Sequence, residues 1–254
     1  MNNLFILGEF GDPIQQYQLD RVIGQIVVQE GRNRDVDAGT EDVIDTGASL
    51  SAPNGTELFD YKSGDVNDAA AGTGARTFRV TGVNAASVVI TEDVTLNGTT
   101  VVAGTVAFTH VHSMVVLTAG SGATNAGAIT ATGTVSFNVN ATIVAGANRT
   151  YQGVYWVPSG KVAYILATPL RLLESLVTAQ VSVLCKVNAN SLETAVHAVS
   201  AGSAGTVGGG ASDVPGILPK PVKVTAGGII TLEATSSAAD QDVWCDLVMA
   251  VYDA

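Results

Sequence analysis

Short runs of alternating apolar and polar residues, separated by turn residues, dominate this sequence from about residue 41 onward. Alternation sends successive side chains to opposite faces of a strand, whereas Gly, Pro and Asn supply the backbone angles of tight turns. Many short strands at this spacing predict an all-β protein, either a β-sandwich or a jelly roll. Residues 170–176 alone read as a possible helical turn, with strand as the alternative. The expected strands cover residues 77–81, 87–96, 105–117, 134–144, 151–157, 162–172, 177–187, 194–199, 222–225, 229–235 and 243–252.

The first forty residues follow a different pattern and are predicted to form an N-terminal arm and linker. An apolar spacing of i, i+3, i+4, i+7 and i+8 indicates a helix, but Gly24 and the β-branched residues favour almost equally an extended arm in which residues 22–29 add a strand. The polar run 31–40 reads as a linker. We expect two sandwich parts to follow, at 41–146 and 147–254, or a single unit made of both. The apolar residues of the arm, which are candidates for assembly contacts, are Leu19, Val22, Ile23, Ile26 and Val27.

Composition argues against several functions. The net charge is −11, with 12 Lys and Arg against 23 Asp and Glu, and the densest basic pair, Arg32 and Arg34, is flanked by acidic residues. Nucleic-acid binding requires clustered cations, so direct DNA or RNA binding is not expected. Neither a signal peptide nor an apolar stretch of about 18 residues is recognisable, so no membrane span is expected. Apolar residues make up 46% and charged residues 14% of the chain, which favours a folded protein whose surface is covered in an assembly.

The two cysteines, Cys185 and Cys245, each lie in an alternating apolar run. We expect two buried free thiols in strands; a disulfide between neighbouring strands is the alternative, because spacing alone does not decide it. The Gly/Ser-rich run 200–212 lacks the Lys-Ser/Thr of a phosphate-binding loop and is expected to be a surface loop.

Three patterns in the sequence resemble reactive or metal-binding sites. Asp45, in an Asp-Thr-Gly-Ala sequence, resembles the catalytic loop of retroviral-type aspartic proteases, but the chain holds no second such motif and a strand-ending turn is preferred. His110 and His112 alternate on one strand and so share a face. They are the candidates for a metal site, although a solvent-facing or interface pair is favoured. The candidate calcium ligands are the carboxylates of Asp240, Asp242 and Asp246, which lack the pattern of a dedicated calcium loop. No enzyme activity, cofactor or metal is expected.

Charged and aromatic residues of the strands have simpler interpretations. Arg76 and Arg79 are three residues apart and point to opposite faces of a regular strand. Glu92 or Asp93 is expected to pair with one of these arginines across the sheet. The aromatic residues of the second half are expected to pack in the core, and a sugar-stacking role is the alternative; they are Tyr151, Tyr155, Trp156 and Trp244.

Five segments together resemble a family of bacteriophage virion proteins that recurs in marine and freshwater phages. The most specific are residues 65–83 (DVNDAAAGTGARTFRVTGV), 90–100 (ITEDVTLNGTT) and 117–130 (LTAGSGATNAGAIT). Residues 155–164 (YWVPSGKVAY) and 228–243 (GIITLEATSSAADQDV) carry less specific matches. The resemblance spans roughly residues 65–243 and leaves out the arm.

This resemblance implies a non-enzymatic component of the phage particle, assembled in the host cytoplasm. We expect a capsid decoration or cement protein that forms a homotrimer or another homo-oligomer and binds the major capsid protein. The alternative is a receptor-binding, vertex, fibre or tail-associated sandwich that contacts the host surface.

Overall fold

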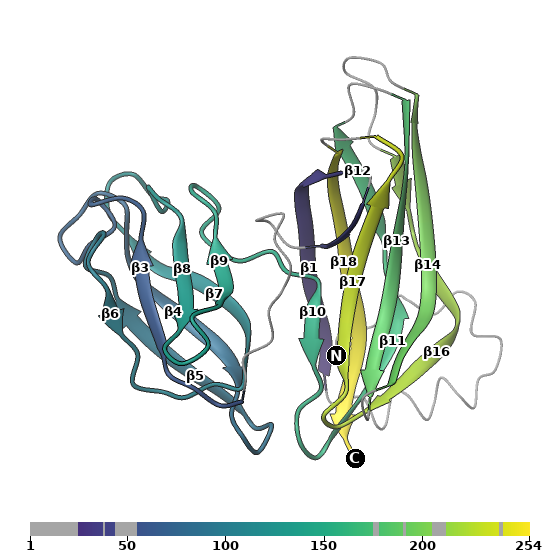
Figure 1. Ribbon diagram of the computed structural model, residues 1–254, viewed down its shortest axis with the longest axis horizontal. Coiled ribbons are helices and arrows are strands. Elements are labelled where there is room, and N and C mark those ends of the chain that lie inside the picture. Colours follow the sequence, from purple (N-terminus) through teal and green to yellow (C-terminus); the bar gives the residue numbers. More distant parts are fainter. Residues whose placement is uncertain are drawn as a thin grey trace, which may run out of the picture.

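The computed structural model describes residues 25–37, 39–43, 55–174, 178–189, 192–204, 212–238 and 241–254. Every regular element in these ranges is a β-strand, which confirms the expected all-β class. The strands form two lobes, each with its own hydrophobic core (Figure 1). We call residues 55–149 the insert lobe, and the remaining described strands the jelly-roll lobe.

The jelly-roll lobe is a sandwich of two antiparallel sheets. The first sheet runs β15-β12-β18-β11-β16, and β1 pairs with β18; the second runs β10-β17-β13-β14, and β2 pairs with β17. Strands of the first sheet are β1 (Gln25–Val36), β11 (Lys161–Ala167), β12 (Leu170–Glu174), β15 (Ser212–Val214), β16 (Ile217–Thr225) and β18 (Gln241–Asp253). Strands of the second are β2 (Thr40–Asp42), β10 (Val154–Trp156), β13 (Thr178–Ala189), β14 (Leu192–Ala204) and β17 (Ile229–Ser236).

Strand pairing in this lobe is nested. The first strand pairs with the last, the second strand pairs with the one before the last, and the pairs continue inward toward the middle of the chain. β1 pairs with β18, β2 with β17, β12 and β11 with β15 and β16, and β13 with β14. A long antiparallel ribbon that folds over itself in this way is a jelly roll. The alternating burial of β18 and β17 puts one face of each strand between the sheets. Leu232, Leu247 and Met249 lie in that core.

The insert lobe lies between β2 and β10 in the chain and is a smaller sandwich. One sheet runs β6-β3-β8-β9 and the other β5-β4-β7. Phe59, Tyr61, Phe78, Phe108 and Met114 fill its core, so this lobe concentrates the aromatic side chains that the jelly-roll core largely lacks. Its strands are β3 (Phe59–Ser63), β4 (Ala75–Val83), β5 (Val89–Thr95), β6 (Val102–Ala103), β7 (His110–Ala119), β8 (Ile129–Gly133) and β9 (Val139–Ile143).

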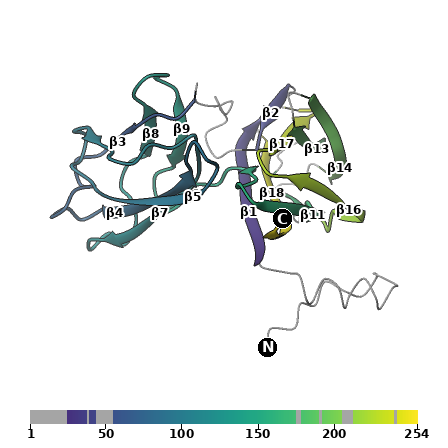
Figure 2. The ribbon, with the colours of Figure 1, turned by 90° about the horizontal axis from the view of Figure 1, so that it is seen from below.

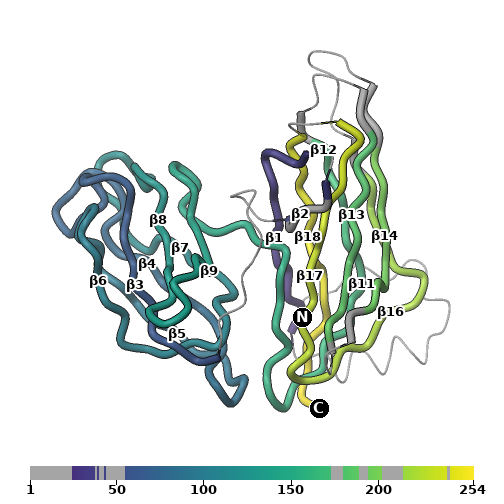
Figure 3. The backbone as a smooth tube through the Cα atoms, viewed as in Figure 1, coloured from purple at the N-terminus to yellow at the C-terminus, as the bar shows by residue number. Residues whose placement is uncertain are grey.

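β1 lies on the side of the jelly-roll lobe that faces the insert lobe, and the chain crosses between the lobes after β9 (Figures 2 and 3). The helix considered for the arm is wrong where the structure describes it, because Ile26 and Val27 are in β1 and pair with Ala250 and Met249. Leu19, Val22 and Ile23 lie outside the described residues. The strand alternative holds from Gln25 onward, and the predicted linker at 31–40 is wrong for residues 31–36, which continue the same strand.

The physical reason is the open edge of β18, which supplies β1 with a ladder of backbone hydrogen bonds that no local helix signal can outweigh. Gly31 fits this contact because a Cβ there would lie 2.8 Å from the Cys245 carbonyl oxygen and 2.9 Å from the Gly153 Cα. The expected boundaries also shift. The unit predicted at 41–146 begins with β2, which belongs to the jelly-roll lobe, and the segment considered as a helical turn forms β12.

Candidate functional site

The most exposed apolar side chains of the described residues lie at one end of the insert lobe. Phe137 is 79% exposed and Val135 is 72% exposed in the connection from β8 to β9, and the exposed Leu58 and Val139 flank them. The Thr134 N–H and hydroxyl both donate to the Leu58 carbonyl at 3.0 Å, and Val139 lies opposite Thr132 in the sheet. We call Leu58, Val135, Phe137 and Val139 the apolar tip.

A buried carboxylate holds the apolar tip in shape. Glu57 accepts hydrogen bonds from the Val135 N–H at 2.7 Å, the Ser136 N–H at 2.9 Å and the Ser136 hydroxyl at 2.5 Å. Burial by itself would raise the pKa of Glu57, but these three hydrogen bonds outweigh it and keep the pKa below its ordinary value. The Phe137 N–H also donates to the Gly133 carbonyl at 3.0 Å. The tip is therefore fixed before any partner arrives, which lowers the entropy cost of binding.

Phe137 has a φ of 57°, in the left-handed region that costs a non-glycine residue about 1–2 kcal/mol. The Glu57 hydrogen bonds offset this cost. The fold thus maintains a strained backbone that presents an aromatic ring to solvent, where the ring buries little surface within the lobe. Exposed aromatic side chains on rigid supports are typical of the energetic centre of a protein–protein contact.

The segment that supplies most of the tip is poor in charge. Residues 94–148 contain no Lys, Arg, Asp or Glu, although about a quarter of the residues in a typical soluble domain are charged. This run supplies β6, β7, β8 and β9, and it also exposes Val101, Val115 and Leu117. A surface of this composition is weakly hydrated and suited to burial against another protein.

Two more buried carboxylates organise the loops of the insert lobe. The fully buried Asp68 accepts from the Ser63 hydroxyl and from the N–H groups of Ala75, Ala126 and Gly127, at distances of 2.5–2.9 Å. Each of these donors is neutral. The carboxylate therefore joins two loops far apart in sequence and serves as a structural fastening. The Glu92 carboxylate likewise accepts hydrogen bonds from the Tyr61 hydroxyl and from the N–H and hydroxyl of Thr105.

The histidine pair predicted from alternation lies at the junction of the two lobes. His110 and His112 share one face of β7, with ring centroids 5.6 Å apart, and both are buried. His112 stacks on Tyr155 at 4.8 Å and His110 lies 5.9 Å from Trp156, both on β10 of the other lobe. The solvent-facing alternative is therefore wrong, and the pair is an interface between lobes. Within the described ranges, no third His, Cys, Asp or Glu joins these rings in a metal-binding group.

Several other predicted positions have identifiable partners. Arg79 forms a two-point ion pair with Asp93, directly opposite on β5, which confirms the expected cross-strand pair. Cys185 and Cys245 are buried free thiols, as predicted. The Trp244 indole N–H donates to Asp246 at 2.7 Å. Asp45 and Asp240 lie outside the described residues.

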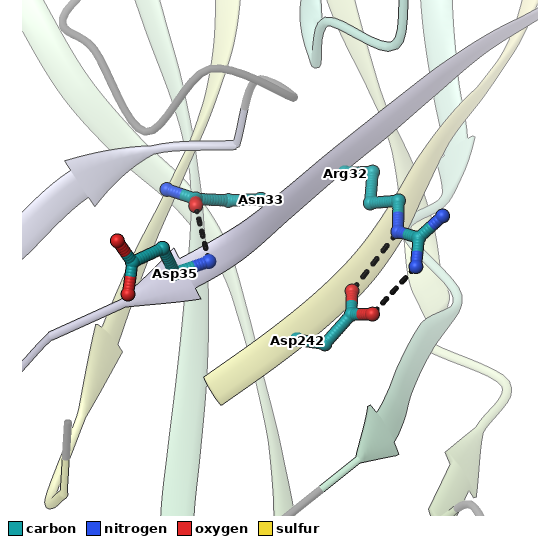
Figure 4. Close-up of polar contacts among 4 residues, drawn as sticks. All are labelled: Arg32, Asn33, Asp35 and Asp242. Atoms are coloured by element: carbon teal, nitrogen blue, oxygen red, sulfur yellow. Dashed lines mark hydrogen bonds and ion pairs between the residues drawn. The ribbon is translucent and has the colours of Figure 1, made fainter. Parts of the chain in front are cut away.

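Asp242, one of the candidate calcium ligands, instead forms an ion pair with the side chain of Arg32 (Figure 4). The Arg32 Nε and one terminal nitrogen meet its two carboxylate oxygens at 2.9 and 2.5 Å, and the guanidinium lies 5.6 Å from the centre of the Trp244 ring. One residue along β1, the Asn33 side-chain oxygen accepts from the Asp35 N–H at 2.9 Å, where the pairing with β18 shifts register. The Arg32–Asp242 ion pair fastens β1 to β18, so one member of the predicted basic pair and one candidate calcium ligand stabilise the fold.

Neither a known family model nor a curated protein matches this sequence. The part of the chain that the structure describes contains no helix long and apolar enough to cross a membrane.

Sequence reasoning missed the apolar tip, although its signal was present. Val135, Phe137 and Val139 alternate, which predicted a strand at 134–144 without indicating which of its faces is exposed. β9 begins only at Val139, and the three side chains are exposed. Alternation identifies a common face but not the side on which solvent lies. The absence of charge over 94–148 was the independent clue that this face is unusual.

Proposed function

We propose that this chain is a structural component of a bacteriophage particle, a decoration or cement protein that forms oligomers and binds the major capsid protein. The resemblance of residues 65–243 to phage virion proteins supports this assignment. The observation that carries it is the apolar tip: a pre-formed, strained and exposed aromatic side chain within a segment, residues 94–148, that holds no charged residue. Such a surface is suited to holding another protein.

The energetics of the tip favour a repeated contact. Full burial of a side chain such as Phe137 contributes about 1.5–3 kcal/mol, which is too little for a stable complex on its own. A stable interface buries about 1,600 Å² in total, so flanking surface must be covered as well. On a particle the same contact recurs in every copy, and linked contacts strengthen one another.

The test separates binding from folding through one substitution. Phe137→Asn removes the ring and places at φ 57° a residue that tolerates this conformation. We expect unchanged or slightly higher thermal stability, together with at least about a 30-fold loss of affinity for purified heads that lack the protein, since a central aromatic contact contributes about 2 kcal/mol or more. Val66→Asn, at an exposed apolar position of the same lobe outside the uncharged run, serves as the matched control and should bind normally.

Particle composition tests the assignment itself. Cryo-electron microscopy of whole particles should place many copies on the head, and heads without the protein should rupture at lower temperature. Copurification with tails at low copy number would instead support the receptor-binding alternative. If Phe137→Asn and the unaltered protein bound the purified heads with equal affinity, the apolar tip would not be part of the contact.

A further inference from the structure

Neutral polar side chains form a group of hydrogen bonds at the junction between the lobes. The Gln152 side-chain amide donates to the carbonyls of Val111 and His112 at 2.8 and 2.9 Å. The Gln29 amide on β1 donates to the same His112 carbonyl at 2.9 Å and to the Gln152 carbonyl at 3.0 Å. These contacts surround the start of β7 and bind it to the jelly-roll lobe.

A second set of contacts continues along β7. The Thr150 N–H donates to the Met114 carbonyl at 2.9 Å, and the Met114 N–H donates to the Thr150 hydroxyl at 3.0 Å. The imidazole rings of His110 and His112 occupy the middle of this junction, against Tyr155 and Trp156.

The geometry of His112 suits only a neutral ring. The Trp156 backbone N–H lies 3.3 Å from the Nε2 of His112 and donates to it. A proton on that nitrogen would remove the acceptor and turn two donors toward each other. The Nε2 of His110 and the indole N–H of Trp156 are buried without hydrogen-bond partners, so a charge on His110 would also be poorly solvated.

Among the described residues, the acidic groups on the elements around the pair already have partners of their own. On the elements packed against the pair, β1 carries Glu30, Arg32, Arg34 and Asp35, and the connection to β10 carries Arg149. Arg149 pairs with Glu30 at 2.5 Å, and Arg32 pairs with Asp242. The three residues of β10 are uncharged. On the insert-lobe side, the neighbouring strands β4 and β5 carry Arg79 and Asp93, which are paired on the exposed face.

The remaining charges of these two strands have contacts of their own. The Arg76 Nε on β4 donates to the Gly72 carbonyl at 3.0 Å, and the Glu92 carboxylate on β5 is held by Tyr61 and Thr105. Burial lowers the pKa of His110 to about 4, and burial together with the adjacent His110 lowers the pKa of His112 to about 3.

We infer that the junction is an acid-sensitive latch, in which protonation of His110 and His112 releases the insert lobe from the jelly-roll lobe. Both rings stay neutral while docked and regain the ordinary histidine pKa of about 6.5 when undocked. Docking is therefore fully favourable above about pH 6.5 and weakens as pH falls toward 4. At pH 5 each histidine lowers the docking equilibrium about 30-fold and the pair lowers it about 1,000-fold.

Amide hydrogen exchange on the full-length protein tests this inference, because it detects rare opening. The Thr150 and Trp156 amides report on the junction. After correction for intrinsic rates, their protection should fall by up to about 1,000-fold from pH 7.5 to pH 5, a range in which ordinary carboxylates stay charged. Core amides of both lobes should keep their protection. The two histidine rings should titrate in step with this opening.

Variants make the test specific. The chain has three histidines, and the third, His197, lies on β14 away from the junction. His197→Gln should keep the full pH response, whereas the His110→Gln/His112→Gln double variant should show less than about a threefold change. A constant protection in the unaltered protein, or an equal pH response in the double variant, would overturn the latch. If the double variant does not fold, histidine titration of the unaltered protein decides: two ordinary values near 6.5 without opening exclude the latch.

Discussion

Asp68 offers the sharpest test of how the insert lobe is held together. Its two carboxylate oxygens divide four donors: one takes the N–H groups of Ala75 and Ala126, and the other takes the Ser63 hydroxyl and the Gly127 N–H. In Asp68→Asn, one of these oxygens becomes an NH₂ group. The Ser63 hydroxyl can rotate to accept from it, but at least one buried backbone N–H loses its acceptor and faces another donor.

The magnitude follows from these contacts. An unsatisfied buried N–H costs about 1–3 kcal/mol, and each lost hydrogen bond to a charged acceptor costs a further 1.5–3 kcal/mol before relaxation. We therefore expect Asp68→Asn to destabilise the insert lobe by about 2–4 kcal/mol. A lobe of this size responds with a fall in its melting temperature of at least about 8 °C.

Differential scanning calorimetry checks the prediction, because two lobes with separate cores can give distinct transitions. The matched control is Asp93→Asn, which removes an exposed carboxylate from its ion pair with Arg79 and should leave the melting temperature of the lobe nearly unchanged, because solvent screens an exposed pair. Equal effects of the two substitutions would refute the reasoning, since they would show that burial and the number of donors do not set the contribution.

Two further predictions concern the jelly-roll lobe. Gly31→Ala places a Cβ against the backbone of Cys245 and Gly153, so urea denaturation should show a loss of about 1–3 kcal/mol; unchanged stability would mean that β1 does not pack as described. Burial raises the pKa of Cys185 to about 12 and raises that of Cys245 as well, so a thiol reagent at pH 8 should modify both thiols only after denaturation. Rapid labelling of the native protein would contradict their burial.

The sequence alone predicted the strands, and the direction of side chains along them, better than any other feature of this protein. Alternation at 105–117 predicted both β7 and the shared face of His110 and His112, since side-chain direction along a strand is a local property. The sequence also predicted that Glu92 or Asp93 pairs with an arginine across the sheet, and the register of β4 and β5 makes that pair Arg79 and Asp93. Cys185 and Cys245, each within an alternating run, were correctly placed in strands as buried thiols.

Tertiary structure decided what lies opposite each strand. The 25–36 segment became a strand because β18, at the far end of the chain, offers an edge to it. The residues around Ile26 in the sequence give no indication that this strand edge is available. The nesting of the insert lobe between β2 and β10 likewise depends on pairings between distant segments, which the turn residues do not encode.

Exposure was decided in the same way. Phe137 and His112 both belong to alternating apolar runs, yet the first is open to solvent and the second is sealed between two lobes. The sequence determined that these residues share a face with their neighbours at i±2, because backbone geometry fixes that relation. Only the folded arrangement determined which faces are covered, because burial depends on segments that reach a strand from elsewhere in the chain.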